Sequence, residues 1–263
     1  MDSQKWTARY CGHSASNGGG TCHNNESQYF VPEAVTLNES GKAVITAKKI
    51  SSVPQTGLCL GKICNFTSGR FDTQGKVSFM YGLIESRIKV PSGSGNWPAF
   101  WMLGDNITDL GWPKSGEIDI MEQWRFETQR TSAATHYPDR LGSHRFDVGE
   151  ISLNYDFSQD FHIYSLVWMP DVLEFYVDGI LFFKVSKSGS DNCNYTAANV
   201  LKPNCTAQTD AWPFNQYFFM IFNNAISDQA SSFNKWDGWE TSEMAIDYVR
   251  VYTVNSFGTV KVK

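Results

Sequence analysis

The 263-residue sequence predicts an all-β fold, either a sandwich or a barrel of antiparallel strands. Short runs throughout the chain alternate apolar and polar residues, which is the period of a half-buried strand. Gly, Pro, Asn and Asp separate these runs, and Tyr176–Ile180 places Asp-Gly at the turn of a predicted hairpin. No long segment carries a helical apolar stripe with caps, so sheets must build the core.

The alternating runs give the predicted strands in chain order. They are Ala43–Lys48, Lys76–Phe79, Leu83–Val90, Ile163–Met169, Leu173–Val177, Leu181–Val185 and Ala245–Tyr252. The last run is as apolar as the middle ones, so we expect it to pair inside a sheet. Segments 17–20 and 186–212 are predicted to be loops. Nothing resembles an interdomain linker, which predicts a single domain over residues 1–263.

Charge and aromatic content narrow the ligand class. The chain has 22 Lys and Arg against 27 Asp and Glu, a net charge of −5 without basic clusters. This balance disfavours nucleic acids and heavily sulfated polymers, because both require grouped cations. Aromatic residues make up 14% of the chain, with 9 Trp, and this surplus suits a groove that stacks on flat sugar rings or bases. No apolar run is long enough to span a membrane. A neutral ligand is therefore expected. The protein is also expected to be a monomer.

Cysteine usage and sequons favour an oxidising, secretory context and a secreted protein. Proximity predicts the pairs Cys11–Cys22, Cys59–Cys64 and Cys193–Cys205. An alternative zinc site would use Cys11, Cys22, His13 and His23, but the spacing does not resemble a metal knuckle. The Asn-x-Ser/Thr sequons begin at Asn25, Asn38, Asn65, Asn106, Asn194 and Asn204. Met1 is followed by no apolar signal segment, as expected for an initiator placed on a mature chain.

The run Glu117–Glu122, with sequence Glu-Ile-Asp-Ile-Met-Glu, carries the candidate chemistry. Side chains alternate along a strand, so Glu117 and Asp119 share one face while the isoleucines face the core. Glu122 has the wrong parity and would be buried unpaired, which is costly. A one-residue β-bulge near Ile120-Met121, with Met121 in the bulged position, would return Glu122 to the acidic face.

Three crowded carboxylates raise the pKa of at least one member of the group. Glycoside hydrolysis needs this arrangement, because one carboxylate must attack the anomeric carbon while another, still protonated, protonates the leaving oxygen. Two alternatives are a solvated acidic strand face and a Ca²⁺ site built from the same acids. The surrounding aromatic residues, Trp97, Trp101, Trp112 and Trp124, favour a sugar site over core packing alone.

The acid run resembles the signature of glycoside hydrolase family 16, in the bulged form of laminarinases. Further segments are similar to motifs of the same family along nearly the whole chain. They are Asn24–Tyr29, Tyr81–Lys89, Gly95–Gly104, Phe161–Gly179 and Ile246–Tyr252. The resemblance implies one catalytic domain, a jelly-roll sandwich of two curved antiparallel sheets of the concanavalin A-like kind, with the substrate on the concave face.

Residue by residue, the resemblance implies Glu117 as nucleophile, Asp119 as its assistant and Glu122 as general acid/base. The implied substrate contacts are Asn25, Glu85, Arg87, Trp97, Trp101, Trp112, His136 and Asn223. Arg87 as a surface charge and His136 as a structural histidine are the alternatives. No catalytic cofactor is expected. A structural Ca²⁺ is common in the family, and Asp247 stands where such a ligand would be.

Three departures from the family pattern bear on the substrate. Cys22 precedes the Asn pair where Trp or Gly is more usual, and Gln123–Phe126 is not the small-residue run of laminarinases. Asn25 also begins a sequon, and we expect it to be unmodified because a glycan would block the site. The leading hypothesis is a retaining endo-β-1,3-glucanase. The alternatives are a family hydrolase or transglycosylase acting on mixed-linkage glucan, agar or carrageenan, and a non-catalytic β-glucan-binding recognition protein.

Overall fold

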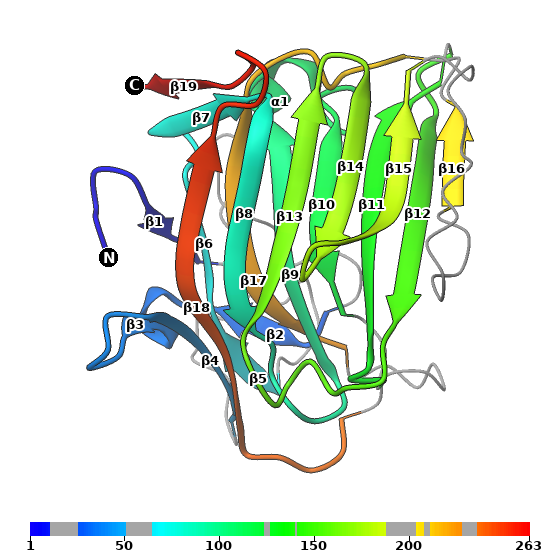
Figure 1. Ribbon diagram of the computed structural model, residues 1–263. Helices are drawn as coiled ribbons and strands as arrows, with labels where there is room; N and C mark the ends of the chain where they lie inside the picture. Colours follow the sequence, from blue (N-terminus) through cyan, green and yellow to red (C-terminus); the bar gives the residue numbers. More distant parts are fainter. Residues whose placement is uncertain are drawn as a thin grey trace.

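The computed structural model describes residues 1–10, 26–50, 65–123, 127–139, 141–187, 204–207, 211–227 and 236–263, with backbone only for 204–207. These residues form two large β-sheets and two short helical turns (Figure 1). The strands are β1 (Thr7–Ala8), β2 (Gln28–Phe30), β3 (Val35–Leu37), β4 (Ala43–Lys49), β5 (Phe66–Ser68), β6 (Arg70–Asp72), β7 (Val77–Met80), β8 (Gly82–Lys89), β9 (Asn96–Gly104), β10 (Glu117–Glu122), β11 (Arg130–Pro138), β12 (His144–Ser152), β13 (His162–Met169), β14 (Val172–Val177), β15 (Ile180–Ser186), β16 (Asn204–Ala207), β17 (Phe218–Ile226), β18 (Thr241–Tyr252) and β19 (Thr259–Val262). The helical turns are η2 (Pro32–Ala34) and α1 (Ile107–Leu110).

The first sheet has nine strands in the order β1-β6-β17-β9-β10-β11-β12, with β7 and β19 joined beside β17. The second has ten strands in the order β16-β15-β14-β13-β8-β18-β4-β5-β2, with β3 beside β4. Among the described strands, the β15–β16 and β2–β5 pairs are parallel and the other pairs are antiparallel. The two-sheet, all-β prediction is therefore confirmed.

Every predicted strand is present to within a few residues, and the last one, β18, pairs with both β8 and β4 inside the second sheet. The predicted hairpin joins β14 to β15, and Asp178 and Gly179 both have positive φ, at 49° and 79°. This is the backbone that a two-residue type I′ turn requires. One prediction was wrong: segment 186–212 is not all loop, because β16 lies within it and pairs with β15.

An aromatic ladder on the core side of the first sheet supports the strands that carry the acids. Phe71, Phe222 and Phe100 lie directly opposite one another on β6, β17 and β9. The Phe100–Phe222 ring centroids are 4.5 Å apart and the Phe71–Phe222 centroids 5.2 Å, both stacked. Met121 of β10 continues the row beside Phe100. Dense packing of this kind holds the backbone of four adjacent strands in a fixed relation.

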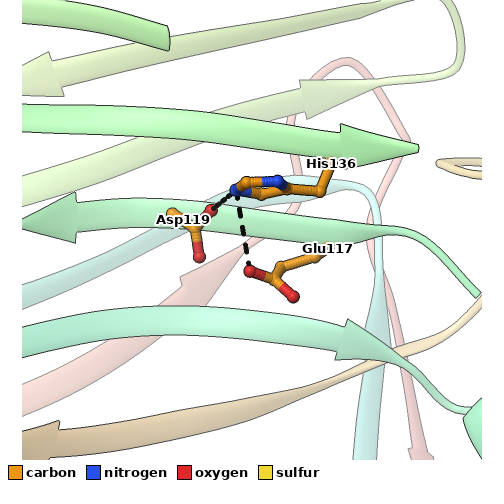
Figure 2. Close-up of side chains that lie close together, drawn as sticks. All are labelled: Glu117, Asp119 and His136. Carbon is orange, nitrogen blue, oxygen red and sulfur yellow. Dashed lines mark ion pairs between the residues drawn. The ribbon is translucent and has the colours of Figure 1, made fainter. Parts of the chain in front are cut away.

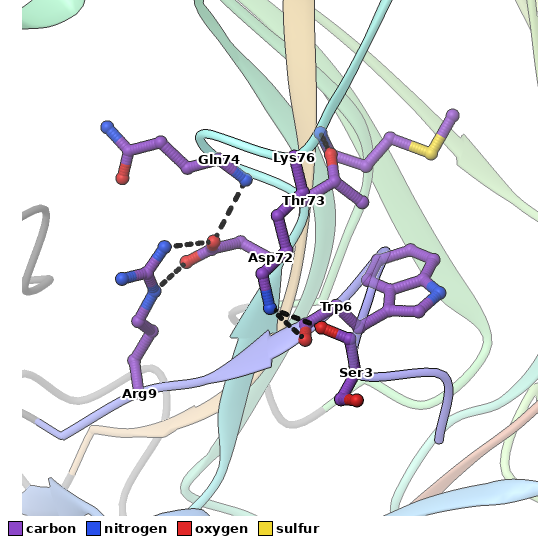
Figure 3. Close-up of polar contacts among 8 residues, drawn as sticks. Ser3, Trp6, Arg9, Asp72, Thr73, Gln74 and Lys76 are labelled. Atoms are coloured by element: carbon purple, nitrogen blue, oxygen red, sulfur yellow. Dashed lines mark hydrogen bonds and ion pairs between the residues drawn. The ribbon is translucent and has the colours of Figure 1, made fainter. Parts of the chain in front are cut away.

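The N-terminal segment is fastened to the same sheet. Strand β1 pairs with β6, and Arg9 just beyond it forms a two-pronged ion pair with Asp72 at 2.7 and 2.8 Å (Figure 3). Lys76 donates hydrogen bonds to the backbone carbonyls of Ser3 and Trp6. These contacts tie the first ten residues to strand β6 and to the turn that follows it. No helix in the described part of the chain is long and apolar enough to cross a membrane.

Candidate active site

The predicted β-bulge is present in β10 and brings the three acids together. The register shifts between Asp119 and Glu122 against β11, and between Asp119 and Met121 against β9. Ile120 is the residue left without a register partner on β9, rather than Met121 as predicted. Ile118, Ile120 and Met121 are all fully buried in the core. Glu117, Asp119 and Glu122 therefore project from the opposite face of the first sheet, which we call the acid face.

Each glutamate accepts a hydrogen bond from a tryptophan indole. Trp97 Nε1 donates to Glu122 Oε1, and Trp112 Nε1 donates to Glu117 Oε2, both at 2.9 Å. Trp97 comes from β9 beside the acids, whereas Trp112 lies in the turn that precedes β10. An indole is a donor only, so each bond orients one carboxylate and favours its ionised form. Trp97 and Trp112 thus hold the two carboxyl groups in fixed positions.

His136 of β11 lies directly opposite Glu117 and faces two of the acids (Figure 2). Its Nε2 is 3.2 Å from Asp119 Oδ2 and 3.8 Å from Glu117 Oε1. Its Nδ1 is 2.8 Å from Nε2 of His144 on β12. His136 therefore lies on the acid face, with Nε2 directed at two of its carboxylates.

Burial and mutual repulsion raise the pKa of all three acids. Burial, followed by the charge of Asp119, raises the pKa of Glu117 to about 8. Burial, followed by the charge of Glu122, raises the pKa of Asp119 well above its ordinary value, and burial also raises the pKa of Glu122. The charges of these groups act on one another, so their titrations depend on each other. Raised pKa values favour retention of protons by the cluster, and the acid role requires a retained proton.

These raised pKa values predict that the acid cluster lowers stability at neutral and alkaline pH. Between pH 4.5 and about 8, Glu117 keeps its proton in the native state but loses it in the unfolded chain. The native state then binds more protons, so its stability falls as pH rises through this window. Glu117→Gln removes the effect and is expected to raise the free energy of unfolding at pH 8 by roughly 1–3 kcal/mol.

Urea unfolding of wild type and Glu117→Gln at pH 5 and pH 8 measures this effect. The gain should be small at pH 5 and larger at pH 8. Glu39→Gln, at an exposed and remote position, reports the general effect of removing one negative charge. A Glu117→Gln gain that does not depend on pH, or that matches the Glu39→Gln gain, would contradict the expectation.

Trp101 and Asn223 also lie on the acid face, as the sequence predicted. Trp101 is directly opposite Asp119 in the register, and its Nε1 donates to Asn223 Oδ1 at 2.7 Å. Asn224, the next residue, points the other way, is fully buried and donates to Asn96 Oδ1. Strand parity thus decides which of the two adjacent asparagines accompanies the acids.

The sequence interpretation missed two charged groups beside the site. Arg70, the first residue of β6, pairs with Asn223 in the register and lies 5.1 Å from the Trp101 ring centroid. Its Nε has no hydrogen-bond partner among the described residues. Glu26 accepts a hydrogen bond from Gln28 at 2.6 Å, and burial raises its pKa to about 7. Glu26 lies in the segment Asn24–Tyr29, which resembles a family motif, but no local pattern pointed to Arg70.

Glu85 and Arg87 do not lie near the acids, which corrects the prediction that they contact sugar. They belong to β8 in the second sheet, where Ile84 and Ile88 are the core-facing residues. Glu85 and Arg87 therefore project from the outer surface of the other layer, with the whole core between them and Glu117. The segment that contains these two residues was correctly predicted to form a strand. The alternation of apolar and polar residues along it, however, does not show which sheet the strand joins.

Asp247 does not fit a Ca²⁺ ligand. Lys42 Nζ binds one of its carboxylate oxygens at 2.6 Å, and Arg87 Nη1 binds the other at 2.7 Å. These two cations lower the pKa of Asp247 and occupy both oxygens that a calcium ion would need. The alternative of a calcium site at the acids is also a poor fit. The group that could hold a metal there is Glu117, Asp119 and His136, and its imidazole nitrogen is not a calcium ligand.

Some predictions fall outside the described residues. Asn25, Trp124 and five of the six cysteines belong to this group, and no side chain is described for Cys205. The disulfide pairs, the zinc alternative and the sugar contact of Asn25 therefore stay predictions.

Comparisons with known proteins agree with this site. The family model described as glycosyl hydrolases family 16 matches residues 24–216. The clotting factor G alpha subunit of Tachypleus tridentatus is 34% identical over 229 residues, covering 87% of this chain and 30% of that protein. Glucan endo-1,3-beta-glucosidase A1 of Niallia circulans is 31% identical over 271 residues, covering 96% of this chain and 36% of that protein. The chain thus spans about a third of the length of these two relatives.

The crystal structure of the laminarinase catalytic domain from Thermotoga maritima MSB8 superimposes with a TM-score of 0.75. It is 33% identical in sequence, and the match covers 97% of this chain and 93% of that one. This likeness confirms the predicted jelly-roll sandwich. The family-model match covers most of the chain, including the bulged strand and all three acids, and the chain therefore belongs to glycosyl hydrolase family 16.

Proposed function

We propose that this chain is an endo-hydrolase of β-1,3-glucan that acts by double displacement with retention of anomeric configuration. The observation that carries the proposal is the bulged strand β10, which gathers three carboxylates that the sheet would otherwise separate. Crowded, half-buried acids destabilise a fold, so their retention is best accounted for by function. The likeness to the Niallia circulans glucan endo-1,3-beta-glucosidase and the Thermotoga maritima laminarinase supports the substrate.

In this mechanism the two glutamates have different roles. Glu117, oriented by the Trp112 indole, passes its proton to Asp119 and attacks the anomeric carbon as a carboxylate, while Glu122, oriented by Trp97, gives its proton to the departing sugar oxygen. A covalent glycosyl-enzyme forms and the first product leaves. Glu122 then takes a proton from water, which attacks the anomeric carbon and releases Glu117. Asp119, between them in the strand, assists by sharing a proton with Glu117 and separating the two pKa values.

The groups on β6, β9 and β17 would bind the sugar chain beside the cleaved bond. The Trp101 indole offers a flat apolar ring, and Asn223 and Arg70 offer polar groups for hydroxyls. The net charge of −5 favours a neutral polysaccharide over a sulfated one. The family needs no catalytic cofactor, because carboxylates supply both the nucleophile and the proton.

The proposal extends to secretion. An even number of cysteines and six sequons support it, and the sequon asparagines Asn38 and Asn65 lie at exposed positions. Recovery of the protein with N-linked sugar from a secreting eukaryotic host, and a mass shift after deglycosylation, would support this part of the proposal. Retention inside the cell without modification would count against it.

The test of the catalytic proposal is reducing-end release from laminarin, lichenan, agarose and carboxymethyl-cellulose, with proton NMR of the first product anomer. We expect laminarin to be cut fastest and the β-anomer to appear first. If lichenan or agarose is cut fastest, the proposed hydrolase activity stands and the proposed substrate is wrong. Binding of laminarin without release of reducing ends would replace the proposal with a glucan-recognition role.

A further inference from the structure

An aromatic surface extends from the acids to the edge of the first sheet. His136 of β11 lies opposite Phe146 of β12, and His144 stands two residues before Phe146 on the same face. Trp112 packs against His144 with ring centroids 4.4 Å apart. The side chains of Trp112 and Phe146 are 48% and 58% exposed, so the surface is open to solvent. We call Trp112, His136, His144 and Phe146 the aromatic floor.

The rings of the aromatic floor spread across the sheet instead of forming one column. The centroids of His136, His144 and Phe146 are 5.1, 5.7 and 5.8 Å apart, close to an equilateral triangle, and the ring planes differ by only 17–25°. If the three rings were stacked in one column, the two outer centroids would lie farther from each other than from the middle one. The two imidazoles also share a hydrogen bond, which lies in the plane of each ring and places them edge to edge. Trp112, tilted by 45°, borders this flat area.

The direction of the sugar chain leads it over this floor. Glu117 and Glu122 lie along one strand, and a retaining mechanism places the scissile bond between them. The polysaccharide must then cross β10 and continue over the neighbouring strands on both sides. On one side it meets Trp101, Asn223 and Arg70, and on the other it meets His136 and then β12. Adjacent strands are about 4.8 Å apart, so β12 lies about 10 Å from β10, beyond the sugar next to the cleaved bond.

The chemistry of the floor suits a neutral sugar ring. Flat, solvent-exposed rings bind the apolar face of a pyranose, and Nδ1 of His144, the ring nitrogen that does not face His136, can bond to its hydroxyls. The charged groups on the same strand are satisfied elsewhere: Glu150 pairs with Arg130, Arg145 pairs with Asp139, and Asp147 accepts a hydrogen bond from Tyr137. No unpaired charge among these groups therefore opposes a neutral ligand.

We propose that His144 and Phe146, with Trp112 and His136, form a sugar-binding subsite at β12 that stacks a glucose unit beyond the one next to the cleaved bond. This inference rests on the proposed function, because the occupant is a further unit of the same β-1,3-glucan chain. It makes the β12 edge a determinant of substrate length. A pure packing role is a poor account of Phe146, which has more than half of its surface in solvent.

The test measures kcat/KM of Phe146→Ala on linear β-1,3-gluco-oligosaccharides of increasing length. Loss of one stacked ring should lower kcat/KM on long oligosaccharides roughly tenfold and leave the shortest cleavable one unchanged. Phe146→Tyr keeps the ring and should retain the wild-type value. Tyr252→Ala, an exposed aromatic on the other sheet, is the matched control and should have no effect.

Binding of the same oligosaccharides to Glu117→Ser, with and without Phe146→Ala, separates affinity from turnover. Equal length dependence in wild type and Phe146→Ala would overturn the subsite while leaving the proposed hydrolase intact. If the wild type cleaves no glucan, and Phe146→Ala binds glucan more weakly than the protein that keeps Phe146, the hydrolase proposal is wrong and the subsite stands. If Phe146→Ala instead lowers the sedimentation coefficient without changing kinetics, the floor is a contact between two copies of the chain and the subsite is wrong.

Discussion

Replacing Glu117 with serine is expected to lower kcat on laminarin by roughly 10⁴- to 10⁶-fold, with little change in KM. Serine offers no carboxylate to form the glycosyl-enzyme, whereas the aromatic and polar groups that bind sugar remain in place. The variant should stay folded, because burial of the Glu117 carboxyl beside Asp119 is unfavourable and its loss removes that cost. Initial rates of reducing-end release, with circular dichroism as the folding control, measure the effect.

Azide identifies the role of each glutamate. In Glu117→Ser, azide can enter the space of the missing carboxylate, attack the anomeric carbon from the same side and leave the product with inverted configuration. In Glu122→Ala, Glu117 still forms the glycosyl-enzyme, so azide gives a product with retained configuration. Activated aryl glycosides, which need no protonated leaving group, should rescue the first step in Glu122→Ala but not in Glu117→Ser. If the two variants behave in the opposite way, the roles of Glu117 and Glu122 are exchanged.

Replacing Asp72 with alanine is expected to lower the free energy of unfolding by about 3–5 kcal/mol. Asp72 is fully buried, accepts two hydrogen bonds from Arg9 and one from the backbone N–H of Gln74, and favours the charged form of Arg70 (Figure 3). Removal of the Asp72 carboxylate leaves Arg9 without a counter-charge. It also takes away a negative charge that lies near Arg70. Urea unfolding at pH 7 measures the loss. Since Arg70 lies beside Trp101, a weaker affinity for oligosaccharides should accompany it.

Two further variants make the Asp72 result interpretable. Asp171→Ala breaks an exposed ion pair with Lys187 at 3.5 Å and should cost under about 0.5 kcal/mol, because solvent screens such pairs. Asp72→Asn keeps an acceptor for Arg9 and should lose less stability than Asp72→Ala, which keeps the experiment useful if the alanine variant does not fold. A loss below about 1 kcal/mol in Asp72→Ala would show that the buried pair contributes little to this fold.

Local alternation predicted seven of the nineteen described strands. The strands β4, β7, β8, β13, β14, β15 and β18 follow from period-two patterns, and the β14–β15 turn follows from Asp178-Gly179. The bulge in β10 also follows from sequence, because Glu122 has the wrong parity for a face shared with Glu117. These features depend on neighbours within a few residues, so the sequence contains what is needed to predict them. Strand β16 was missed because it lies in a segment with few apolar residues.

The sequence by itself determined the all-β class, the acid face of β10 and the choice of Glu117, Asp119 and Glu122, because strand parity is a local property. Only the tertiary structure decided which strands lie beside them. It placed Glu85 and Arg87 on the far side of the second sheet, gave Asp247 two cationic partners, and brought Arg70 and Phe146 to the acid face. Strand order and register depend on contacts between residues far apart in the chain. The alternation of apolar and polar residues within a strand does not specify which sheet that strand will join.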